Sequence, residues 1–245
     1  MVLGDDKMKI KYVLFDLDGT LLPMDQDTFM KAYFGGLCKK LAPHGYNPDE
    51  LVGAIWQGTK MMVKNNGDKT NEEVFWDAFV QLLGKRVLTD SHLLDEFYIE
   101  RFDDVQASCG YNEKAKASVD TIKELGFGVV LATNPLFPSI ATEKRMKWAG
   151  FTPSDFMMFT TYENSRHCKP NLDYYRDILA SIGATAEECI MVGNDVGEDM
   201  IAKNLGMKVF LLDDCLINKS GEDISVYPHG SFDELINYMG EITND

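Results

Sequence analysis

Cysteine arrangements that bind metal ions or cross-link small secreted domains are missing from this sequence. No CxxC pair occurs, and no histidine stands at the spacing that zinc ligands use. The odd number of cysteines and their wide scatter instead predict reduced thiols in a cytoplasmic protein. These cysteines are Cys38, Cys109, Cys168, Cys189 and Cys215.

Long hydrophobic runs are missing too. No stretch approaches the roughly 18 consecutive apolar residues that a membrane-spanning helix needs. The first nine residues, Met1 to Lys9, carry charges of both signs and lack the apolar segment of a secretory signal. We also find no internal repeat and no low-complexity segment. These absences predict a globular protein without a membrane partner.

Positive charge is scarce relative to negative charge. The chain has 24 lysines and arginines against 39 aspartates and glutamates, which gives a formal net charge of -15. Such a surface repels nucleic acids and anionic membranes, so a site for an anionic substrate depends on locally placed cations or on a metal. A length of 245 residues predicts either one domain with a large insertion or two modest domains.

Short apolar runs alternate with helical patterns along most of the chain. The runs predict strands buried on both faces, as in a parallel sheet covered by helices, and the alternation indicates a doubly wound α/β fold. The predicted strands are Ile10–Leu17, Gly128–Thr133, Phe156–Thr161, Cys189–Val192 and Lys208–Leu212. The predicted helices of this part are Glu113–Leu125, Ser139–Ala149, Asn171–Ile182 and Gly197–Leu205.

The stretch between the first and second strands has a different pattern. Amphipathic helical segments follow one another there, separated by turn residues and without a strand signal. These segments are Thr28–Leu41, Asp49–Lys64, Glu72–Leu83 and Leu93–Phe102. We therefore predict an all-helical cap subdomain over residues 25–108, inserted into an α/β core that comprises residues 1–24 and 109–245.

Polar residues follow the predicted strands at the ends where open α/β sheets bind ligands. They are Asp16, Asp18, Thr133, Asn134, Lys169, Asn194, Asp195 and Asp199. Because alternate residues of an extended segment point the same way, Asp16 and Asp18 are expected to approach one ligand together. Asp199 follows Asp195 by four residues and is therefore expected on the same helical face.

Several carboxylates and one lysine are thus predicted to converge on one edge of the sheet. Like charges held close together raise each other's pKa unless a cation lies among them. A divalent metal meets this need. Oxygen ligands without histidine or cysteine favour Mg²⁺, which completes its coordination with water and substrate phosphate.

The sequence resembles the haloacid dehalogenase (HAD) superfamily at four places, in the right order. The pattern DxDGT at Asp16–Thr20, the apolar run into Thr133, Lys169 before Pro170, and GNDxxxD at Gly193–Asp199 are similar to its four motifs. The helical segment resembles the C1-type cap of members like phosphoglycolate phosphatase and β-phosphoglucomutase. The resemblance implies a Rossmann-like core with strand order 5-4-1-2-3 and a Mg²⁺-dependent hydrolase of a small phosphorylated metabolite.

The same resemblance implies roles in phosphoryl transfer. Asp16 matches the nucleophile that forms an aspartyl-phosphate, which water then cleaves. Asp18 matches the acid/base that protonates the leaving alkoxide and later activates that water. Thr133 and the backbone amide of Asn134 match the groups that bind a phosphoryl oxygen. Lys169 resembles the cation that holds Asp16 and offsets the charge of the transferring group.

The implied Mg²⁺ ligands are the carboxylates of Asp16 and Asp195 and the backbone carbonyl of Asp18. Asp199 is implied as a further ligand or as a residue that orients one. Gly19 is expected to contribute to phosphate binding and to permit a tight turn of the backbone. The cap is expected to set substrate choice, with hinges near residues 22–27 and 107–112.

Two alternatives keep the same motifs. A phosphosugar mutase similar to β-phosphoglucomutase shares every core motif, and a non-catalytic phosphometabolite-binding protein can use the same fold. Dehalogenases and phosphonate hydrolases of the superfamily are disfavoured, because they do not require the second aspartate, Asp18. The expected partners are a small phosphorylated metabolite and no nucleic acid, and the expected state is a monomer or homodimer.

Most other polar and aromatic residues of the cap are expected to be structural. Lys60, Lys64, Lys85 and Arg86 more often belong to a solvated helix face than to a substrate site, and His167 has no motif support. Aromatic residues recur at helical spacing and predict the hydrophobic core of the cap itself. They are Phe29, Tyr33, Trp56, Phe75, Trp76 and Phe79.

Overall fold

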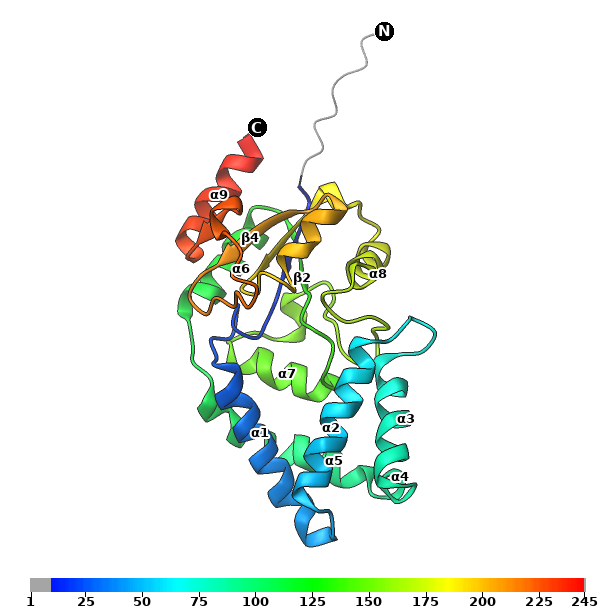
Figure 1. The fold of residues 1–245 in the computed structure, drawn as a ribbon. Coiled ribbons are helices and arrows are strands. Elements are labelled where there is room, and N and C mark those ends of the chain that lie inside the picture. Colours follow the sequence, from blue (N-terminus) through cyan, green and yellow to red (C-terminus); the bar gives the residue numbers. More distant parts are fainter. Residues whose placement is uncertain (1–9, 245) are drawn as a thin grey trace.

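The computed structural model describes residues 10–244, so the charged stretch Met1 to Lys9 lies outside the described residues. Within them, five parallel strands form one sheet in the order β2-β1-β3-β4-β5 (Figure 1). The strands are β1 (Tyr12–Phe15), β2 (Gly128–Leu131), β3 (Cys189–Gly193), β4 (Lys208–Leu212) and β5 (His229–Gly230). The predicted α/β class is confirmed, and the first strand, β1, lies inside the sheet between β2 and β3.

The predicted strand at residues 156–161 is wrong as an extended strand, although its place beside β2 is right. The structure has a single parallel bridge there, between Phe159 and Leu131. The Met157 amide donates to the Val129 carbonyl (2.8 Å), and the Leu131 amide donates to Met158 (3.0 Å). The segment pairs with β2 alone among the described residues, and this pairing is limited to one bridge. Strand β5 was not predicted, because a strand of two residues is too short to show an apolar run or an alternation in the sequence.

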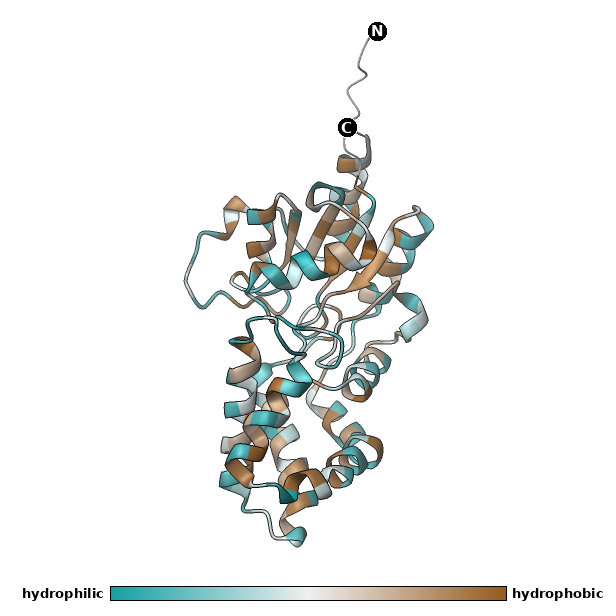
Figure 2. Cartoon of the chain, turned by 90° about the vertical axis from the view of Figure 1, so that its right-hand side faces the viewer, coloured by the Kyte–Doolittle hydropathy of each residue, from teal (hydrophilic) through white to brown (hydrophobic). Residues whose placement is uncertain are grey.

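Helices cover both faces of the sheet. Alternate strand residues point to opposite faces, as Val13 and Phe15 on one side and Leu14 on the other illustrate. The first face packs against α6 (Glu113–Glu124), α7 (Ser139–Trp148) and α9 (Phe232–Asn244). The second face packs against α8 (Leu172–Ile182) and the 3₁₀ segment η5 (Met200–Leu205). Figure 2 shows hydrophobic residues along the strands between these layers.

Helices alone form the chain between β1 and β2, as predicted. They are α1 (Gln26–Leu41), the 3₁₀ segment η1 (Ala42–His44), α2 (Pro48–Val63), α3 (Asn71–Leu83), the short α4 (Arg86–Thr89), α5 (Ser91–Glu100), the 3₁₀ segment η2 (Phe102–Ser108) and then α6. Side-chain caps begin several of them. Asp25 accepts from the Thr28 amide at the start of α1, and Thr70 forms a capping box with Glu73 at the start of α3.

Besides the packing of α7 against α5 and η2, the helical segment meets the core at two further places. The two linkers lie side by side. Met24 and Cys109 form an isolated antiparallel β-bridge there, and the Gly110 amide donates to the Pro23 carbonyl (2.7 Å). At the other place, Asn71 at the start of α3 is fully buried, and its amide donates to the Ser165 carbonyl of the core (2.8 Å). These contacts hold the helices over the carboxyl edge of the sheet (Figure 1).

Two further sequence predictions are tested by the fold. All five cysteines have free thiols, as predicted. Within residues 10–244, no helix combines the length and the apolar character that a membrane crossing needs.

Candidate active site

Asp16 is the first residue after β1, and the neighbouring strands fix its position. Phe15 pairs with Leu131 of β2 and with Val192 of β3. The Asp16 amide donates to the Val192 carbonyl (3.0 Å), and only 7% of Asp16 is exposed. The predicted position of this carboxylate, at the carboxyl end of a central strand, is confirmed.

Lys169 links Asp16 to Asp199. Its Nζ donates to Asp16 Oδ1 at 2.9 Å and to Asp199 Oδ1 at 2.6 Å, and the side chain is 1% exposed. Burial disfavours the charged ammonium, but the two carboxylates outweigh burial and hold the pKa of Lys169 well above its ordinary value. Burial raises the pKa of Asp199 to about 7, although Lys169 favours its ionised form. The buried ammonium of Lys169 therefore forms ion pairs with two carboxylates, those of Asp16 and Asp199.

Replacing Lys169 with methionine is expected to destabilise the fold, because two buried carboxylates lose the cation that pairs with both. Removing one partner of a buried ion pair costs about 3–5 kcal/mol. Urea unfolding in the presence of EDTA measures this loss without a metal to compensate for it. The double variant Lys169→Met/Asp199→Asn should recover part of the lost free energy of unfolding. A single variant as stable as the wild-type protein would contradict the expectation.

Asp18 contacts Arg145, a residue that the sequence analysis did not single out. Arg145 lies on α7 without exposed surface, and its Nη1 donates to Asp18 Oδ2. Its guanidinium also lies 4.5 Å from the centroid of the Phe137 ring. In the sequence, Arg145 stands in a basic run from Lys144 to Lys147 that is typical of a solvated helix. No local signal marks it as a partner of Asp18.

The second oxygen of Asp18 is buried and lacks a partner. Asp18 Oδ1 has no hydrogen bond to any residue that the structure describes. Burial raises the pKa of Asp18, and the attraction of Arg145 offsets this only in part. Because buried polar atoms are normally paired, this oxygen is available to a bound ligand.

The turn after Asp18 requires glycine at position 19. Gly19 has a φ of +88°, and a Cβ atom there would lie 2.3 Å from Asn194 Nδ2. Thr20 follows, with its Oγ1 3.2 Å from Asp16 Oδ2 and 3.0 Å from Asn194 Oδ1. The expected tight turn is confirmed. Thr20 belongs to the DxDGT pattern but was not assigned a role from the sequence.

The loop after β3 is a tight turn, so the helix predicted at residues 197–205 is wrong for its first part. Asp195 Oδ1 accepts from the backbone amides of Gly197 (2.8 Å) and Glu198 (3.0 Å). Such side-chain acceptors compete with helical hydrogen bonds. A 3₁₀ helix, η5, begins only at Met200.

Both oxygens of Asp199 are occupied by protein donors. Oδ1 accepts from Lys169, and Oδ2 accepts from the Asp195 amide (3.0 Å). A Cβ atom at position 193 would lie 2.1 Å from Asp199 Oδ2, so Gly193 is required for this close packing. Of the two roles considered for Asp199, the geometry fits the residue that orients others better than a direct metal ligand.

Thr133 and Asn134 lie beyond β2, as predicted. Thr133 is 2% exposed, and its carbonyl accepts from the Tyr174 hydroxyl (2.8 Å). The Asn134 carboxamide donates to Glu198 Oε2 (2.9 Å) and accepts from the Lys169 amide (3.2 Å). Asn134 therefore ties together the loops that carry Lys169 and Glu198. Its backbone amide was the group predicted to bind phosphate.

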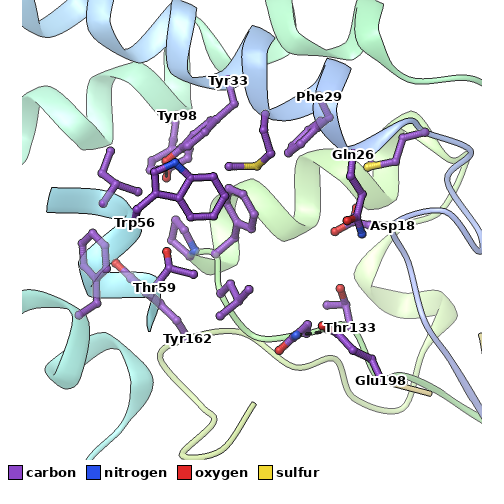
Figure 3. A pocket seen from close by; sticks show the side chains of 18 of the residues that line it. Asp18, Gln26, Phe29, Tyr33, Trp56, Thr59, Tyr98, Thr133, Tyr162 and Glu198 are labelled. Atoms are coloured by element: carbon purple, nitrogen blue, oxygen red, sulfur yellow. Dashed lines mark hydrogen bonds between the residues drawn. The ribbon is translucent and has the colours of Figure 1, made fainter. Parts of the chain in front are cut away.

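A cavity of about 260 Å³ joins these residues to the helical segment. Figure 3 shows Asp18 and Thr133 on one side of it and Trp56, Tyr33 and Tyr98 on the other. All six aromatic residues that were predicted to form the cap core line this cavity. Three of them are buried, but Trp56 is 50% exposed. The predicted packing is therefore correct in part, and the role of these residues as cavity walls was missed.

The cationic residues of the cap lie elsewhere. Lys60, Lys64, Lys85 and Arg86 are exposed and are not among the described residues that line the cavity, in line with the expected solvated faces. His167 contacts the Asp177 carboxylate through Nδ1 (2.8 Å) and is not part of the cavity wall either.

The residues at the sheet edge fit a Mg²⁺ ion, although with few side-chain ligands. No three His, Cys, Asp or Glu side chains within residues 10–244 are arranged as a metal centre. Asp16 and Asp195 both line the cavity, and with the Asp18 carbonyl they are the oxygen donors expected from the family resemblance. Mg²⁺ commonly takes one or two carboxylates and completes its shell with water and substrate phosphate. Among the described residues, the cavity wall contains acidic side chains but no lysine or arginine that could offset the phosphate charge in place of a metal.

Sequence comparison identifies the family. The profile of the haloacid dehalogenase-like hydrolases matches residues 13–212, a range that contains every site residue discussed above. The chain therefore belongs to the haloacid dehalogenase-like hydrolase family. A search of curated proteins found no match.

Solved structures of low sequence identity share the fold. A predicted phosphoglycolate phosphatase from Haemophilus somnus is 15% identical with a TM-score of 0.57, covering 94% of this chain and 97% of the other. A HAD phosphatase from Thermococcus onnurineus is 18% identical with a TM-score of 0.57, covering 94% and 98%. Bacillus subtilis YfnB, described as a HAD-type hydrolase bound to magnesium, is 17% identical with a TM-score of 0.55, covering 94% and 99%.

Proposed function

We propose that the protein is a Mg²⁺-dependent phosphatase that hydrolyses a small phosphorylated metabolite through an aspartyl-phosphate on Asp16. The observation that carries the proposal is the buried pairing of Asp16 with Lys169 at a cavity that Asp18 also lines. The cavity volume of about 260 Å³ lies just below the usual range for ligand pockets, roughly 300–1,000 Å³. This size suits a small metabolite.

The proposed reaction has two halves. Lys169 holds Oδ1 of Asp16, so Oδ2 attacks phosphorus while the ester oxygen leaves with a proton from Asp18. Asp18 then takes a proton from water, which attacks the aspartyl-phosphate, releases inorganic phosphate and restores Asp16. Thr133 and the Asn134 amide donate to the phosphoryl oxygens. A bound Mg²⁺ supplies positive charge that offsets the phosphate dianion.

Removal of divalent metal is expected to abolish activity, because the phosphate dianion would otherwise meet several carboxylates. Hydrolysis of acetyl phosphate in EDTA, and its recovery on adding Mg²⁺, measures this. Asp195→Asn should raise the Mg²⁺ concentration for half-maximal activity by at least about tenfold. Full activity in excess EDTA would remove the metal assignment.

Measuring the release of inorganic phosphate by the purified protein distinguishes a phosphatase from the two alternatives, a phosphosugar mutase and a non-catalytic binding protein. A phosphosugar mutase would interconvert sugar phosphates without net release of inorganic phosphate, and a binding protein would release none from any substrate. No observation in the structure favours either alternative over a phosphatase.

The proposal also covers the division of the chain into cap and core and the location of the protein in the cell. We propose residues 25–108 as the cap and residues 1–24 and 109–245 as the core, and the pairing of Met24 with Cys109 between the linkers supports this division. We also propose a cytoplasmic location, which the free thiols support.

A further inference from the structure

The cavity has two chemically different ends. Asp18 and Thr133 stand at the end where the proposed reaction places the phosphoryl group (Figure 3). Helices α1, α2, α3 and α5 build the opposite end, where Figure 3 shows Tyr33, Trp56 and Tyr98. The organic part of a substrate whose phosphate lies at the first end must therefore contact the second.

Aromatic rings dominate the second end. Trp56 remains 50% exposed although it is large and apolar, and its nearest ring partner is Phe34 at 5.5 Å. Tyr33 and Tyr98 bond to each other through their hydroxyl groups (2.8 Å). Burial raises the pKa of Tyr33 to about 12, so its phenol is neutral. Such surfaces favour a planar ring, which gains stacking or edge-to-face contacts beyond its area of burial.

Electrostatics exclude a second anionic group at this end. The described residues that line the cavity include six acids but no lysine, arginine or histidine. The two buried cations nearby, Lys169 and Arg145, are each paired with carboxylates. Of the six acids, Asp95 is the one contributed by the cap helices. A carboxylate or a second phosphate on the substrate would be repelled there and would find no counter-ion.

The polar groups that remain are hydrogen-bonding groups rather than cations. Thr59 offers a hydroxyl there and Asp95 an acceptor for N–H groups, whereas Gln26 lies beside Asp18 at the other end (Figure 3). These groups can orient a neutral polar molecule. They cannot neutralise an anion.

We propose that the cap end of the cavity selects phosphate monoesters of uncharged alcohols that carry a planar aromatic ring, nucleoside 5′-monophosphates being the matching class of metabolite. The proposal rests on the proposed phosphatase function and specifies its substrate class. It excludes phosphoglycolate, which carries a carboxylate, and sugar bisphosphates, which carry a second phosphate.

A charge-matched panel of substrates tests the proposal. Uridine and adenosine 5′-monophosphates differ from ribose 5-phosphate by the aromatic base, and benzyl phosphate carries a ring without a sugar. We expect kcat/KM to be roughly 10- to 100-fold higher for at least one aromatic ester than for ribose 5-phosphate, and higher still relative to phosphoglycolate. Preference for the nucleotides over benzyl phosphate would identify the nucleoside as the ligand. The reverse preference would identify a simpler aromatic alcohol.

Variants at Trp56 locate the preference in the cap. Trp56→Ala should reduce the ratio of kcat/KM between aromatic and aliphatic esters by roughly tenfold, and Trp56→Phe should restore most of it. Met61→Ala is the matched control, because Met61 is an exposed apolar residue of the same helix outside the cavity. Equilibrium binding of uridine 5′-monophosphate to Asp16→Asn protein, followed by tryptophan fluorescence, should weaken in the same order without depending on turnover.

Acetyl phosphate separates failure of this proposal from failure of the proposed function. If acetyl phosphate is hydrolysed but ribose 5-phosphate or phosphoglycolate equals the best aromatic ester, the substrate class is wrong and the phosphatase assignment stands. An unchanged ratio in Trp56→Ala would likewise overturn the selective role of the cap. If no phosphate ester and no acetyl phosphate is hydrolysed, the function itself is wrong, and the substrate class falls with it.

Discussion

Asp16→Asn protein is expected to form no covalent phosphoenzyme and to lose turnover by on the order of 10⁶-fold, the usual cost of removing a nucleophile that acts as part of a unit. The asparagine keeps the shape of the side chain and an oxygen for Lys169. It lacks the second carboxylate oxygen that attacks phosphorus. Rapid quenching with labelled acetyl phosphate, followed by mass spectrometry of the protein, measures the adduct.

A second aspartate at the same edge of the sheet provides the control. Asp213 follows β4 as Asp16 follows β1, but it is exposed and does not belong to the cavity wall that the structure describes. Asp213→Asn should retain both the phosphoenzyme and turnover. Label that persists in Asp16→Asn, or that maps to a histidine, would show that Asp16 is not the nucleophile.

The strands and the position of Asp16 could be predicted because both depend on short-range patterns, whereas the strand order was implied only by the family resemblance. Apolar runs such as Cys189–Val192 mark buried strands, and polar residues directly after them mark strand ends. Once the strands are parallel, their carboxyl ends share one edge. Asp16, Lys169 and Asp199 therefore meet, at 2.9 and 2.6 Å, although 153 residues separate the first pair.

The close approach of Asp18 to the same cavity was predicted for the wrong reason. Alternation along an extended strand was expected to align it with Asp16, but β1 ends at Phe15 and the chain turns from Leu17 to Thr20. The Gly19 amide donates to the Leu22 carbonyl (2.8 Å) and closes this turn. Both side chains reach the cavity because of a glycine-dependent loop, which a pattern of period two does not describe.

Arg145 and the aromatic walls of the cavity depend on long-range packing. Arg145 reaches Asp18 across 127 residues of sequence, and its neighbours in the sequence resemble any basic helix surface. Trp56 and its aromatic neighbours have the helical spacing of an ordinary core. The space left between the helices and the sheet turns that core into a cavity wall, and helical periodicity carries no information about this space.

Asp18→Asn is expected to slow turnover by roughly 10² to 10⁴, the usual contribution of a general acid or base. Asparagine keeps an oxygen that can accept from Arg145, so the buried guanidinium retains a partner and the fold should be kept. What is lost is the proton that Asp18 delivers to the leaving oxygen and later takes from water. The raised pKa of Asp18, caused by burial, favours the protonated form that the first half-reaction needs.

The two halves of the reaction should respond differently to this substitution. An acyl phosphate has a good leaving group and needs little protonation, so Asp18→Asn should still transfer phosphate from acetyl phosphate to Asp16. Hydrolysis of the aspartyl-phosphate then lacks its base, and the adduct should accumulate. Mass spectrometry of the quenched variant should locate the phosphate on Asp16 in higher yield than in the wild-type protein. Label on residue 18 in the wild-type protein, or turnover of a poor leaving group at the wild-type rate by Asp18→Asn, would overturn the separation of roles between the two aspartates.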